Sequence, residues 1–438
     1  MFKQKLSRVS LPHCKNTADM KPVNIEPVKE VVIPMSMHSG APSVPIVSVG
    51  DHVYLGQKIA EAGEGTSVPC HATVSGKVTK IDVYPFNEKI QAITIESDGK
   101  MEKDPSMKPQ EAKNLKEFLD VVKESGIVGL GGAAYPLWGK LAAAAKTHIK
   151  TFLVNGAECE PYLTGDTRTM VDDCELVKKG VELLKAYTRA EEFIIGIEEN
   201  KPEAIKVMKE TFKDHPEVQI KVLESLYPQG AKQVLLYNAT GKVQAPGSRL
   251  ADLGVLIINV TSLAKMAKHF ETGMPLVDRV VTVDGSACKE PKNLIVPVGT
   301  PISYILEKAG GTTEDLAKVI IGGPMMGKGV ADLNQPIVKA TGGIIAFNKA
   351  ESREYEPTPC IHCGKCVDAC PLRLNPTAFA KAMELEDDKA KLEMLNREQV
   401  SLCMQCGCCS YVCPAHRPLV QTNVEALGFV KKNRAPRK

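Results

Sequence analysis

Residues 360–371 read CIHCGKCVDACP, and residues 403–414 read CMQCGCCSYVCP. Both runs have the spacing C-x2-C-x2-C-x3-C-P, in which three close thiolates wrap three corners of a 4Fe-4S cube. The last corner of each cube faces away from the local loop, so the fourth cysteine of each run reaches the other cube. The spacing therefore predicts two clusters with crossed ligands. The first is expected on Cys360, Cys363, Cys366 and Cys413, and the second on Cys403, Cys406, Cys409 and Cys370.

Cys408 is out of register with this spacing, and its thiol is expected to pack beside the second cluster as a bystander. A pair of zinc sites is the alternative interpretation, because C-x2-C pairs also form zinc ribbons. Zinc ribbons use four ligands as two pairs, a plan that neither the third cysteine nor the trailing C-x3-C-P fits. Two iron-sulfur clusters therefore remain the better interpretation.

The stretch between the two runs, residues 375–399, is rich in Ala, Leu, Met, Glu and Lys and has no internal glycine. This composition predicts helices, so the C-terminal part is expected to be a helical two-cluster module. A pair of clusters carries electrons and does not itself catalyse a reaction. We therefore expect a site elsewhere in the chain that supplies or accepts electrons one at a time.

The whole chain has 438 residues, of which 43% are hydrophobic and 24% charged, and this size predicts three or four domains. Its formal charge of +3 and the lack of an arginine-rich strip argue against nucleic acid as a partner. The longest aliphatic runs, such as VLIINV at 255–260, are far shorter than the roughly 20 residues of a membrane span. We expect a cytoplasmic protein whose clustered cysteines are ligands, because that compartment is reducing.

The middle of the chain, from about Leu115, alternates between helical and strand patterns. Short apolar, β-branched runs occur at 151–158, 192–199 and 218–224, and helical stretches separate them at about 171–190 and 202–214. This rhythm predicts a Rossmann-like α/β domain, with a parallel sheet covered by helices on both faces.

A glycine-rich segment, GIVGLGGAAYP at 126–136, precedes the first of these strands. Gly129, Gly131 and Ala134 nominally match the dinucleotide fingerprint, but that fingerprint must follow a strand and this one follows a helix. Glycines still let backbone N–H groups approach a phosphate, and a helix from about Pro136 would direct its positive end there. Lys140 can add a charge. A glycine-rich turn without a ligand is the alternative for this loop alone.

The segment LVNGAECEPYLTGD at 153–166 follows a buried strand. It places Asn155, Glu158, Glu160 and Asp166 at the end of the strand where open α/β sheets bind ligands. Carboxylates there can bond ribose hydroxyls or a flavin edge, and solvated loop acids are the alternative. Cys159 is expected to pack rather than to act as a nucleophile, since no histidine lies near it in sequence.

Two motifs, GLGGAAYPLWGKL at 129–141 and NGAECEP at 155–161, resemble the flavin loop and the acidic loop of the NADH-binding flavoprotein subunit of respiratory complex I. The segment INVTS at 258–262 partly matches a later motif of that family. The resemblance implies that Glu160 is catalytic and faces the nicotinamide end of NAD(H). It implies FMN on Gly129, Gly131, Gly132, Ala133, Lys140, Asn155, Glu158 and Asn259.

Two positions and one segment depart from the family pattern. Leu130 stands where the family has an arginine, and Ile258 stands where it has an asparagine. The segment PQGAKQ at 228–233 stands where a glycine followed by two glutamates is expected. These departures predict weaker retention of FMN and weaker affinity for NAD more than they affect the fold.

The flanking regions also predict separate domains. Residues 31–95 alternate short β-rich pieces with turns and resemble a lipoyl-type barrel sandwich, but no lysine stands on the hairpin between its halves. A structural or docking role is therefore expected, with His52 and His71 as ordinary surface or packing residues.

Residues 279–311 predict strand, hairpin, strand and helix, similar to the β-grasp (SLBB-like) domain of the same family. The segment IIGGPMMGKG at 320–329 lacks the spacing of a P-loop.

The chain as a whole resembles the C subunit of the Rnf complexes, the membrane-bound ferredoxin:NAD oxidoreductases that couple electron transfer to ion translocation. The resemblance implies a peripheral subunit on the cytoplasmic side of the cell membrane, with an iron-sulfur subunit among its partners. The expected domains are an N-terminal extension (1–30), a barrel sandwich (31–105), an FMN/NADH-binding α/β domain (106–268), a β-grasp domain (269–350), a helical ferredoxin domain (351–425) and a basic tail (426–438).

Two other functions are consistent with the same residues. One is a soluble flavin and iron-sulfur reductase, such as a cobalamin reductase, which the barrel sandwich disfavours. The other is an electron-transfer scaffold whose nucleotide site has decayed, which Leu130 and the missing glutamate pair favour. The end of the chain, VKKNRAPRK at 430–438, is expected to be a disordered, solvated tail, and contact with anionic lipid head groups is the alternative.

Overall fold

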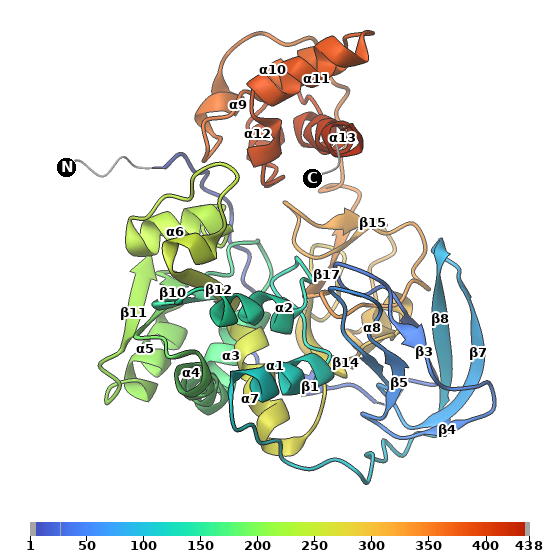
Figure 1. Ribbon diagram of the computed structural model, residues 1–438. Helices are drawn as coiled ribbons and strands as arrows, with labels where there is room; N and C mark the ends of the chain where they lie inside the picture. The colour runs from blue at the N-terminus through green and yellow to red at the C-terminus, as the bar shows by residue number, and fades with distance from the viewer. Residues whose placement is uncertain (1–5, 27, 434–438) are drawn as a thin grey trace.

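The computed structural model describes residues 6–26 and 28–433. Four units follow one another along the chain: a barrel unit of strands, an α/β unit, a mixed-sheet unit and a helical module (Figure 1). The helical module lies above the others in this view and contacts them along one side. The two cysteine runs are therefore carried by a unit of their own, next to the α/β unit.

The α/β unit is built on a four-stranded parallel sheet in the order β11-β10-β9-β12. The chain adds β10 and β11 on one side of β9 and then adds β12 on its other side. The carboxyl ends of β9 and β12 therefore form the switch point, where open α/β sheets bind ligands. Its strands are β9 (Thr151–Gly156), β10 (Glu192–Glu198), β11 (Val218–Leu223) and β12 (Val255–Asn259).

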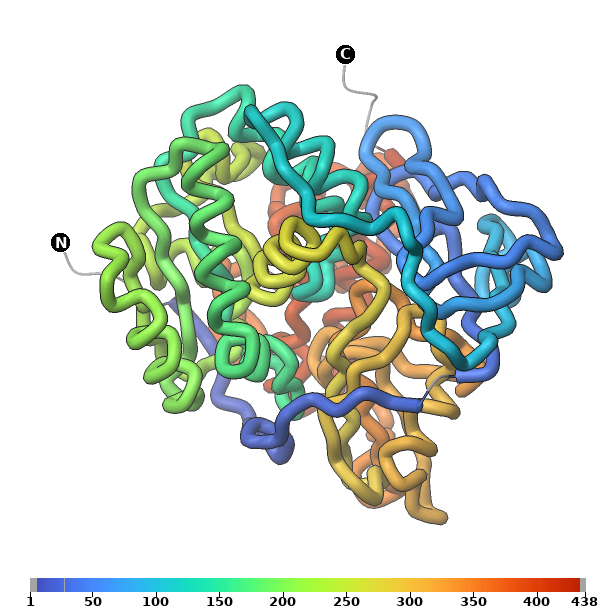
Figure 2. Tube along the Cα trace, turned by 90° about the horizontal axis from the view of Figure 1, so that it is seen from below, coloured from blue at the N-terminus to red at the C-terminus, as the bar shows by residue number. Residues whose placement is uncertain are grey.

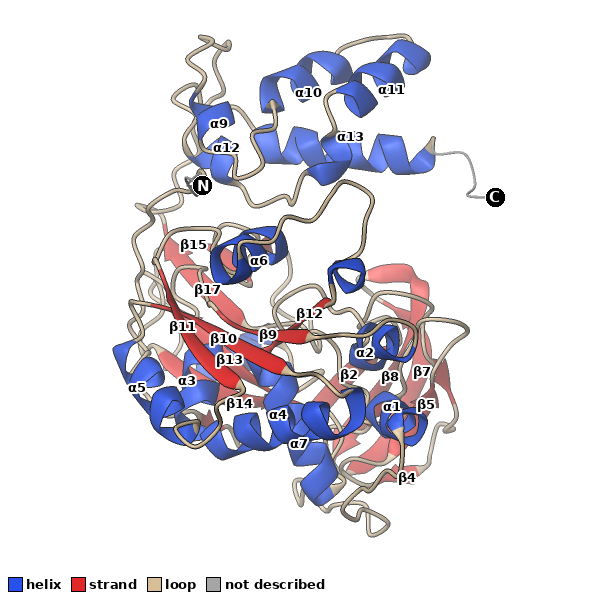
Figure 3. Ribbon diagram, turned by 60° about the vertical axis from the view of Figure 1, so that its left-hand side comes forward, coloured by secondary structure: helices blue, strands red, loops and turns tan. Residues whose placement is uncertain are grey.

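Helices cover both faces of this sheet, as the sequence predicts. Side chains alternate along β9: Phe152 and Val154 join the core on one face, whereas Leu153 joins the core on the other. Figure 3 shows α6 on one side and α3, α4, α5 and α7 on the other. The helices are α1 (Leu115–Glu124), α2 (Leu137–Leu141), α3 (Gly165–Asp172), α4 (Cys174–Thr188), α5 (Pro202–Thr211), α6 (Lys232–Thr240) and α7 (Val260–Thr272), with 3-10 turns η1 (Ala142–Ala145) and η2 (Leu250–Leu253).

The barrel unit consists of two antiparallel sheets, in the orders β2-β8-β7-β4 and β3-β5-β6. A single apolar core fills the space between them. His52 is exposed and lies 3.5 Å from Asp98, whereas His71 is buried. The strands are β2 (Glu30–Pro34), β3 (Val44–Pro45), β4 (His52–Val53), β5 (Lys58–Glu61), β6 (Cys70–His71), β7 (Gly76–Tyr84) and β8 (Asn87–Ser97).

The mixed-sheet unit has a six-stranded sheet in the order β1-β14-β13-β17-β15-β16. Its edge strand β1 (Val23–Asn24) comes from the N-terminal segment, which runs along one edge of the α/β unit to reach it (Figure 2). The other elements are β13 (Asp278–Asp284), β14 (Lys292–Pro297), α8 (Ile302–Lys308), β15 (Leu316–Ile321), β16 (Lys328–Gly329) and β17 (Gly343–Asn348). Strand, strand and helix thus follow the predicted order from residue 279.

The helical module contains α9 (Lys365–Asp368), α10 (Pro376–Met383), α11 (Asp388–Arg397), the 3-10 turn η3 (Val400–Leu402), α12 (Cys408–Tyr411) and α13 (Leu419–Lys432). The stretch between the cysteine runs is helical, as predicted, and forms the two helices α10 and α11. None of the helices within the described ranges has the length and apolar character needed to cross a bilayer.

The expectation of a disordered, solvated tail over residues 430–438 is wrong for its first residues, and the boundary expected at 426 lies inside a helix. Helix α13 continues to Lys432, and Ala426, Leu427 and Val430 are buried against the rest of the helical module. The apolar side chains at this spacing form one face of a helix, which outweighs the basic residues that follow. Residues 434–438 of the predicted tail lie outside the described residues.

Candidate redox centres and flavin site

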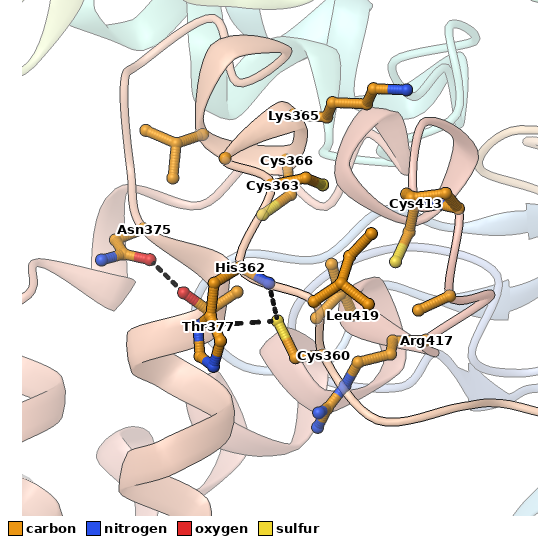
Figure 4. Close-up of a pocket in the computed structure, with 15 residues that line it drawn as sticks. Cys360, His362, Cys363, Lys365, Cys366, Asn375, Thr377, Cys413, Arg417 and Leu419 are labelled. Atoms are coloured by element: carbon orange, nitrogen blue, oxygen red, sulfur yellow. Dashed lines mark hydrogen bonds between the residues drawn. The ribbon is translucent and has the colours of Figure 1, made fainter.

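The structure brings Cys413 of the second run beside the first run. Cys360, Cys363, Cys366 and Cys413 line one cavity of about 140 Å³ (Figure 4). We call these four residues the first cluster site. They are the four that the spacing groups together, and their ligation of a cluster stays a prediction.

Cys370 of the first run lies correspondingly beside the second run. It lines a smaller cavity, of about 20 Å³, together with Cys403, Cys406, Cys408 and Cys409. We call Cys370, Cys403, Cys406 and Cys409 the second cluster site. The fourth cysteine of each run thus shares a cavity with the other run, which is the arrangement that the crossed-ligand prediction requires.

The two runs turn around their cavities with the same backbone conformation, which has positive φ at matching positions. His362 and Gln405 have φ of 54° and 59°, and Gly364 and Gly407, which open the short helices α9 and α12, have φ of 75° and 79°. Left-handed conformations curl the chain tightly, and glycine adopts them at little cost. The short helix then carries the fourth cysteine away from its own loop and toward the other run.

The thiols are spread around these cavities rather than gathered at one point. Among residues 6–26 and 28–433, no three His, Cys, Asp or Glu side chains converge closely enough to hold a single metal ion. Zinc requires ligand sulfurs at about 2.3 Å, whereas a 4Fe-4S cube separates its cysteine ligands around a larger body. The donor set of four thiols around a cavity therefore fits a cube better than zinc.

The second run docks on the α/β unit. The Tyr227 hydroxyl donates a hydrogen bond of 2.8 Å to the carbonyl of Cys406, and Gly407 lies against the carbonyl of Met325. Cys408 is buried in the same contact, among Val9 and Tyr227. The first run has a different environment, because Lys365 and Arg417 line its cavity and Cys363 is exposed.

The glycine loop (residues 129–135) is a closed turn whose tip is open to solvent. The Gly129 N–H donates to the Tyr135 carbonyl at 2.8 Å, and the Leu130 N–H donates to Ser262 Oγ at 2.9 Å. Residues 131–133 are exposed, and their N–H groups have no acceptor in the part of the chain described. A Cβ at Gly131 would lie 3.4 Å from Asn259 Nδ2. The loop therefore has the free donors and the close approach that a phosphate-bearing cofactor requires.

Lys140 follows this loop on α2. Burial lowers the pKa of its ammonium to about 8, and the charge of Lys232 at the start of α6 acts in the same direction. Two cations thus face this region, and Lys232 belongs to the segment where the related family has glutamates. This charge pattern favours an anionic ligand group such as a phosphate.

Asn155 and Asn259 lie directly opposite each other at the switch point, on β9 and β12. Each amide already holds a neighbouring segment: Asn155 Nδ2 donates to the Gly230 carbonyl at 3.0 Å, and Asn259 Nδ2 donates to Asp166 Oδ2 at 2.8 Å. The structure therefore places both residues at the expected edge of the sheet, next to the glycine loop. Their contacts with FMN stay predictions.

Glu158 holds the start of α3. Its carboxylate accepts hydrogen bonds from the Asp166 N–H at 2.9 Å and the Thr167 N–H at 3.2 Å. Burial, followed by the charge of Glu158, raises the pKa of Asp166 to about 6. Glu158 thus has a structural role at a helix N-terminus, and its predicted bond to the flavin is untested.

Glu160 is half-buried beneath the loop between β15 and β16, with its Oε1 shielded from solvent. Its Oε2 accepts a hydrogen bond of 3.0 Å from the Met325 N–H, and its Oε1 has no partner among the described residues. Burial is the main cause that raises the pKa of this carboxyl. A carboxyl with a raised pKa and a free oxygen suits proton exchange with a ligand, but the predicted contact with nicotinamide stays a prediction.

Cys159, between these two glutamates, is a packing residue. Burial above all, and then the charge of Glu198, raises the pKa of its thiol to about 12, and the Gly230 N–H donates to its sulfur at 3.3 Å. A neutral, buried thiol is a poor nucleophile.

Sequence reasoning missed two basic residues that hold this site. Lys15 donates to the carbonyls of Glu158 and Glu160, both at 2.8 Å, and so holds the acidic loop from the N-terminal segment. Arg279, on β13 of the mixed-sheet unit, is buried and donates to the Leu130 carbonyl at 3.3 Å. Neither lies near the site in sequence, so no local pattern could have found them.

Four family models match separate parts of the chain. They are the RnfC barrel sandwich hybrid domain over residues 7–100, the Nuo51 FMN-binding domain over 122–268, the SLBB domain over 280–328 and the 4Fe-4S dicluster domain over 356–416. The fold class expected from the sequence is confirmed at this level: a mixed α/β protein with a barrel sandwich, an FMN domain, an SLBB domain and a dicluster domain. The cofactor predictions of FMN and 4Fe-4S clusters are supported in the same way.

Curated relatives match most of the chain. One is the C subunit of the proton-translocating ferredoxin:NAD(+) oxidoreductase complex of Clostridium ljungdahlii, 40% identical over 84% of this chain and 81% of the relative. Another is the C subunit of the Na(+)-translocating complex of Acetobacterium woodii, 39% identical over 80% of each chain. A solved NAD+-reducing NiFe hydrogenase in the air-oxidized state has a similar fold, with a TM-score of 0.51 and 16% identity over 73% of this chain and 62% of that one.

Proposed function

This chain belongs to the family of C subunits of the ion-translocating ferredoxin:NAD oxidoreductases, the Rnf complexes, and from that membership we propose that it passes electrons between NAD(H), FMN and two 4Fe-4S clusters. An electron-transfer role in a redox complex follows from the family and its domains. The proposal adds the use of NAD(H), the residues involved and the position on the cytoplasmic face of the membrane. Family membership disfavours the soluble cobalamin reductase alternative.

The eight cysteines of the two cluster sites would hold the clusters. The free N–H groups of residues 131–133 and the ammonium of Lys140 would hold the phosphate of FMN. FMN supplies the exchange between the two-electron chemistry of nicotinamide and the one-electron chemistry of clusters. Glu160, whose pKa is raised chiefly by burial, would orient the nicotinamide end and hold a proton there.

One observation supports the path of the electrons: the second run is the one seated on the α/β unit. Tyr227 bonds the carbonyl of Cys406, and Glu160 bonds the same loop that Gly407 contacts. Electrons leaving the α/β unit therefore reach the second cluster site first. They leave the protein through the first cluster site, where Cys363 is exposed.

The exposed first cluster site is the proposed contact with the rest of the complex. We propose an iron-sulfur subunit as the acceptor there, because electron exchange with another protein needs a cluster near the surface. Within the described residues no helix can span the bilayer, and this agrees with attachment through partner subunits on the cytoplasmic side.

A scaffold with a decayed nucleotide site remains the second candidate. The side chains of Asn155, Glu158 and Asn259 already form hydrogen bonds with neighbouring segments of the chain. Lys232 lies in the segment where the related family has glutamates. In such a scaffold the clusters would still carry electrons, but neither FMN nor NADH would act on this chain.

Anaerobic purification of the full chain separates the two candidates. Iron and sulfide for two clusters, released FMN, and bleaching of flavin and cluster absorption by NADH would support the proposal. A flavin-free protein whose cluster absorption does not change on addition of NADH would establish the scaffold instead.

Lys140→Met should lower FMN content about ten- to a hundredfold through loss of a charge-assisted bond. Lys146→Met, an exposed lysine on the same stretch, is the matched control and should change nothing.

A further inference from the structure

Asn423 on α13 is a buried amide beside the second cluster site. Its side chain is 2% exposed. Its Nδ2 lies 3.7 Å from Cys403 Sγ and 3.8 Å from Cys409 Sγ, distances at which an N–H donates to sulfur. One amide thus faces two of the four thiols of the second cluster site.

This amide has no visible role in folding. Its Oδ1 is buried and has no hydrogen-bond partner in the part of the chain described. It lies in the interior of α13 and caps no helix end. A buried amide without a partner for its oxygen destabilises a fold, and a leucine of similar size would fill the same space. The two sulfur contacts are therefore the function of this side chain that the structure shows.

The first cluster site has no equivalent within the described residues. An asparagine there, Asn375, lines the cavity but accepts hydrogen bonds from Thr377 Oγ1 at 2.7 Å and from the Ala378 N–H at 3.2 Å (Figure 4). The described donors to Cys360 Sγ are the His362 N–H at 3.4 Å and the His362 ring at 4.0 Å. A side-chain amide aimed at the thiols therefore distinguishes the second site from the first.

We propose that Asn423 is a positioning residue that donates hydrogen bonds to two cysteine ligands of the second cluster and raises its reduction potential. The inference rests on the cluster assignment proposed above. A reduced cluster carries one more negative charge than an oxidised one, and a donor to its sulfurs stabilises the reduced form more. An amide donates without carrying a charge, so the effect does not depend on pH near neutrality.

The consequence concerns the direction of electron flow. Burial away from water disfavours the more highly charged reduced form and lowers the potential of the second cluster relative to the exposed first one. The Asn423 bonds act in the opposite sense and bring the two potentials closer. A small difference lets electrons cross between the clusters in either direction, which suits a complex that exchanges electrons with NAD(H).

The first test uses the wild-type full chain, so it does not depend on a variant folding. Protein labelled with ¹⁵N in asparagine side chains is reduced, and pulsed EPR measures the coupling of that nitrogen to each cluster. A stronger coupling to the second cluster than to the first, whose cavity Asn375 lines, is expected. The absence of coupling in protein with its full iron content would overturn the role of Asn423 alone. Protein that lacks the second cluster would overturn the cluster assignment, and Asn423 with it.

The second test measures potentials. In Asn423→Leu the equilibrium distribution of one electron between the clusters should shift about tenfold toward the first, which is about 59 mV for a one-electron couple. Asn423→Gln keeps a donor and should restore much of the difference. Asn433→Leu makes the same change at the exposed end of α13 and should leave both potentials alone. Unchanged potentials in Asn423→Leu would overturn the proposal.

Discussion

The two cysteine runs share a spacing and a backbone conformation but differ in their surroundings. In the first run, Cys363 is exposed and Ile361 beside it is 66% exposed. In the second, Cys408 and Cys409 are 1% and 8% exposed, and the run packs on the α/β unit. The comparison teaches that spacing groups the thiols of each site, whereas on the proposed path the surroundings decide which cluster would receive electrons and which one would pass them to a partner.

The largest expected effect comes from breaking the crossed ligands. Cys413→Ser belongs to the second run, yet it should remove the first cluster and about half of the iron, because its thiol lies with Cys360, Cys363 and Cys366. Iron analysis and EPR of the reduced protein measure this. The matched variant Cys370→Ser should remove the second cluster instead. If each variant damaged the cluster of its own run, the exchange would be disproved.

The two clusters should be lost at different rates when metal is removed, because the two runs differ in exposure. Under limiting chelator and mild oxidant, the first cluster should be lost several times faster than the second, because Cys363 is exposed, whereas Cys409 is buried and the second run docks on the α/β unit. The EPR signals of the two clusters followed over time are the measurement. Equal rates of loss would show that the docking does not shield the second cluster.

The docking itself can be loosened at Tyr227. Tyr227→Phe leaves the carbonyl of Cys406 without its donor, a loss of about 1 kcal/mol. Amide hydrogen exchange around residues 403–413 should become about fivefold faster, while residues 360–370 stay unchanged. Tyr411→Phe, at an exposed tyrosine of the second run, is the control. Equal acceleration in both runs would mean that the helical module moves as one body.

The smallest expected effect concerns Cys408. Cys408→Ala should leave the iron and sulfide content intact, because this thiol is outside the ligand spacing. It should lower the free energy of unfolding by about 1 kcal/mol, since the side chain is buried between Val9 and Tyr227. Chemical denaturation and iron analysis test both parts. A loss of iron would make Cys408 a ligand.

Much of the fold could be predicted because its signals are local. The continuous apolar run Phe152, Leu153 and Val154 is what a parallel sheet covered on both faces requires, because successive side chains enter the cores on its two faces. The helices between the strands follow from composition and periodicity. The extension of α13 to Lys432 was missed, because the packing of its apolar face within the helical module decides where that helix ends.

The sequence by itself determined the grouping of thiols and the character of the glycine loop, because both depend on residue types at fixed short spacings. Only the tertiary structure decided which run docks on the α/β unit, and it alone revealed Lys15, Arg279 and Asn423. Lys15 and Arg279 act more than a hundred residues from their partners, at Glu158 and Leu130. Contacts across such distances have no periodicity along the chain, so they exist only once the units have packed together.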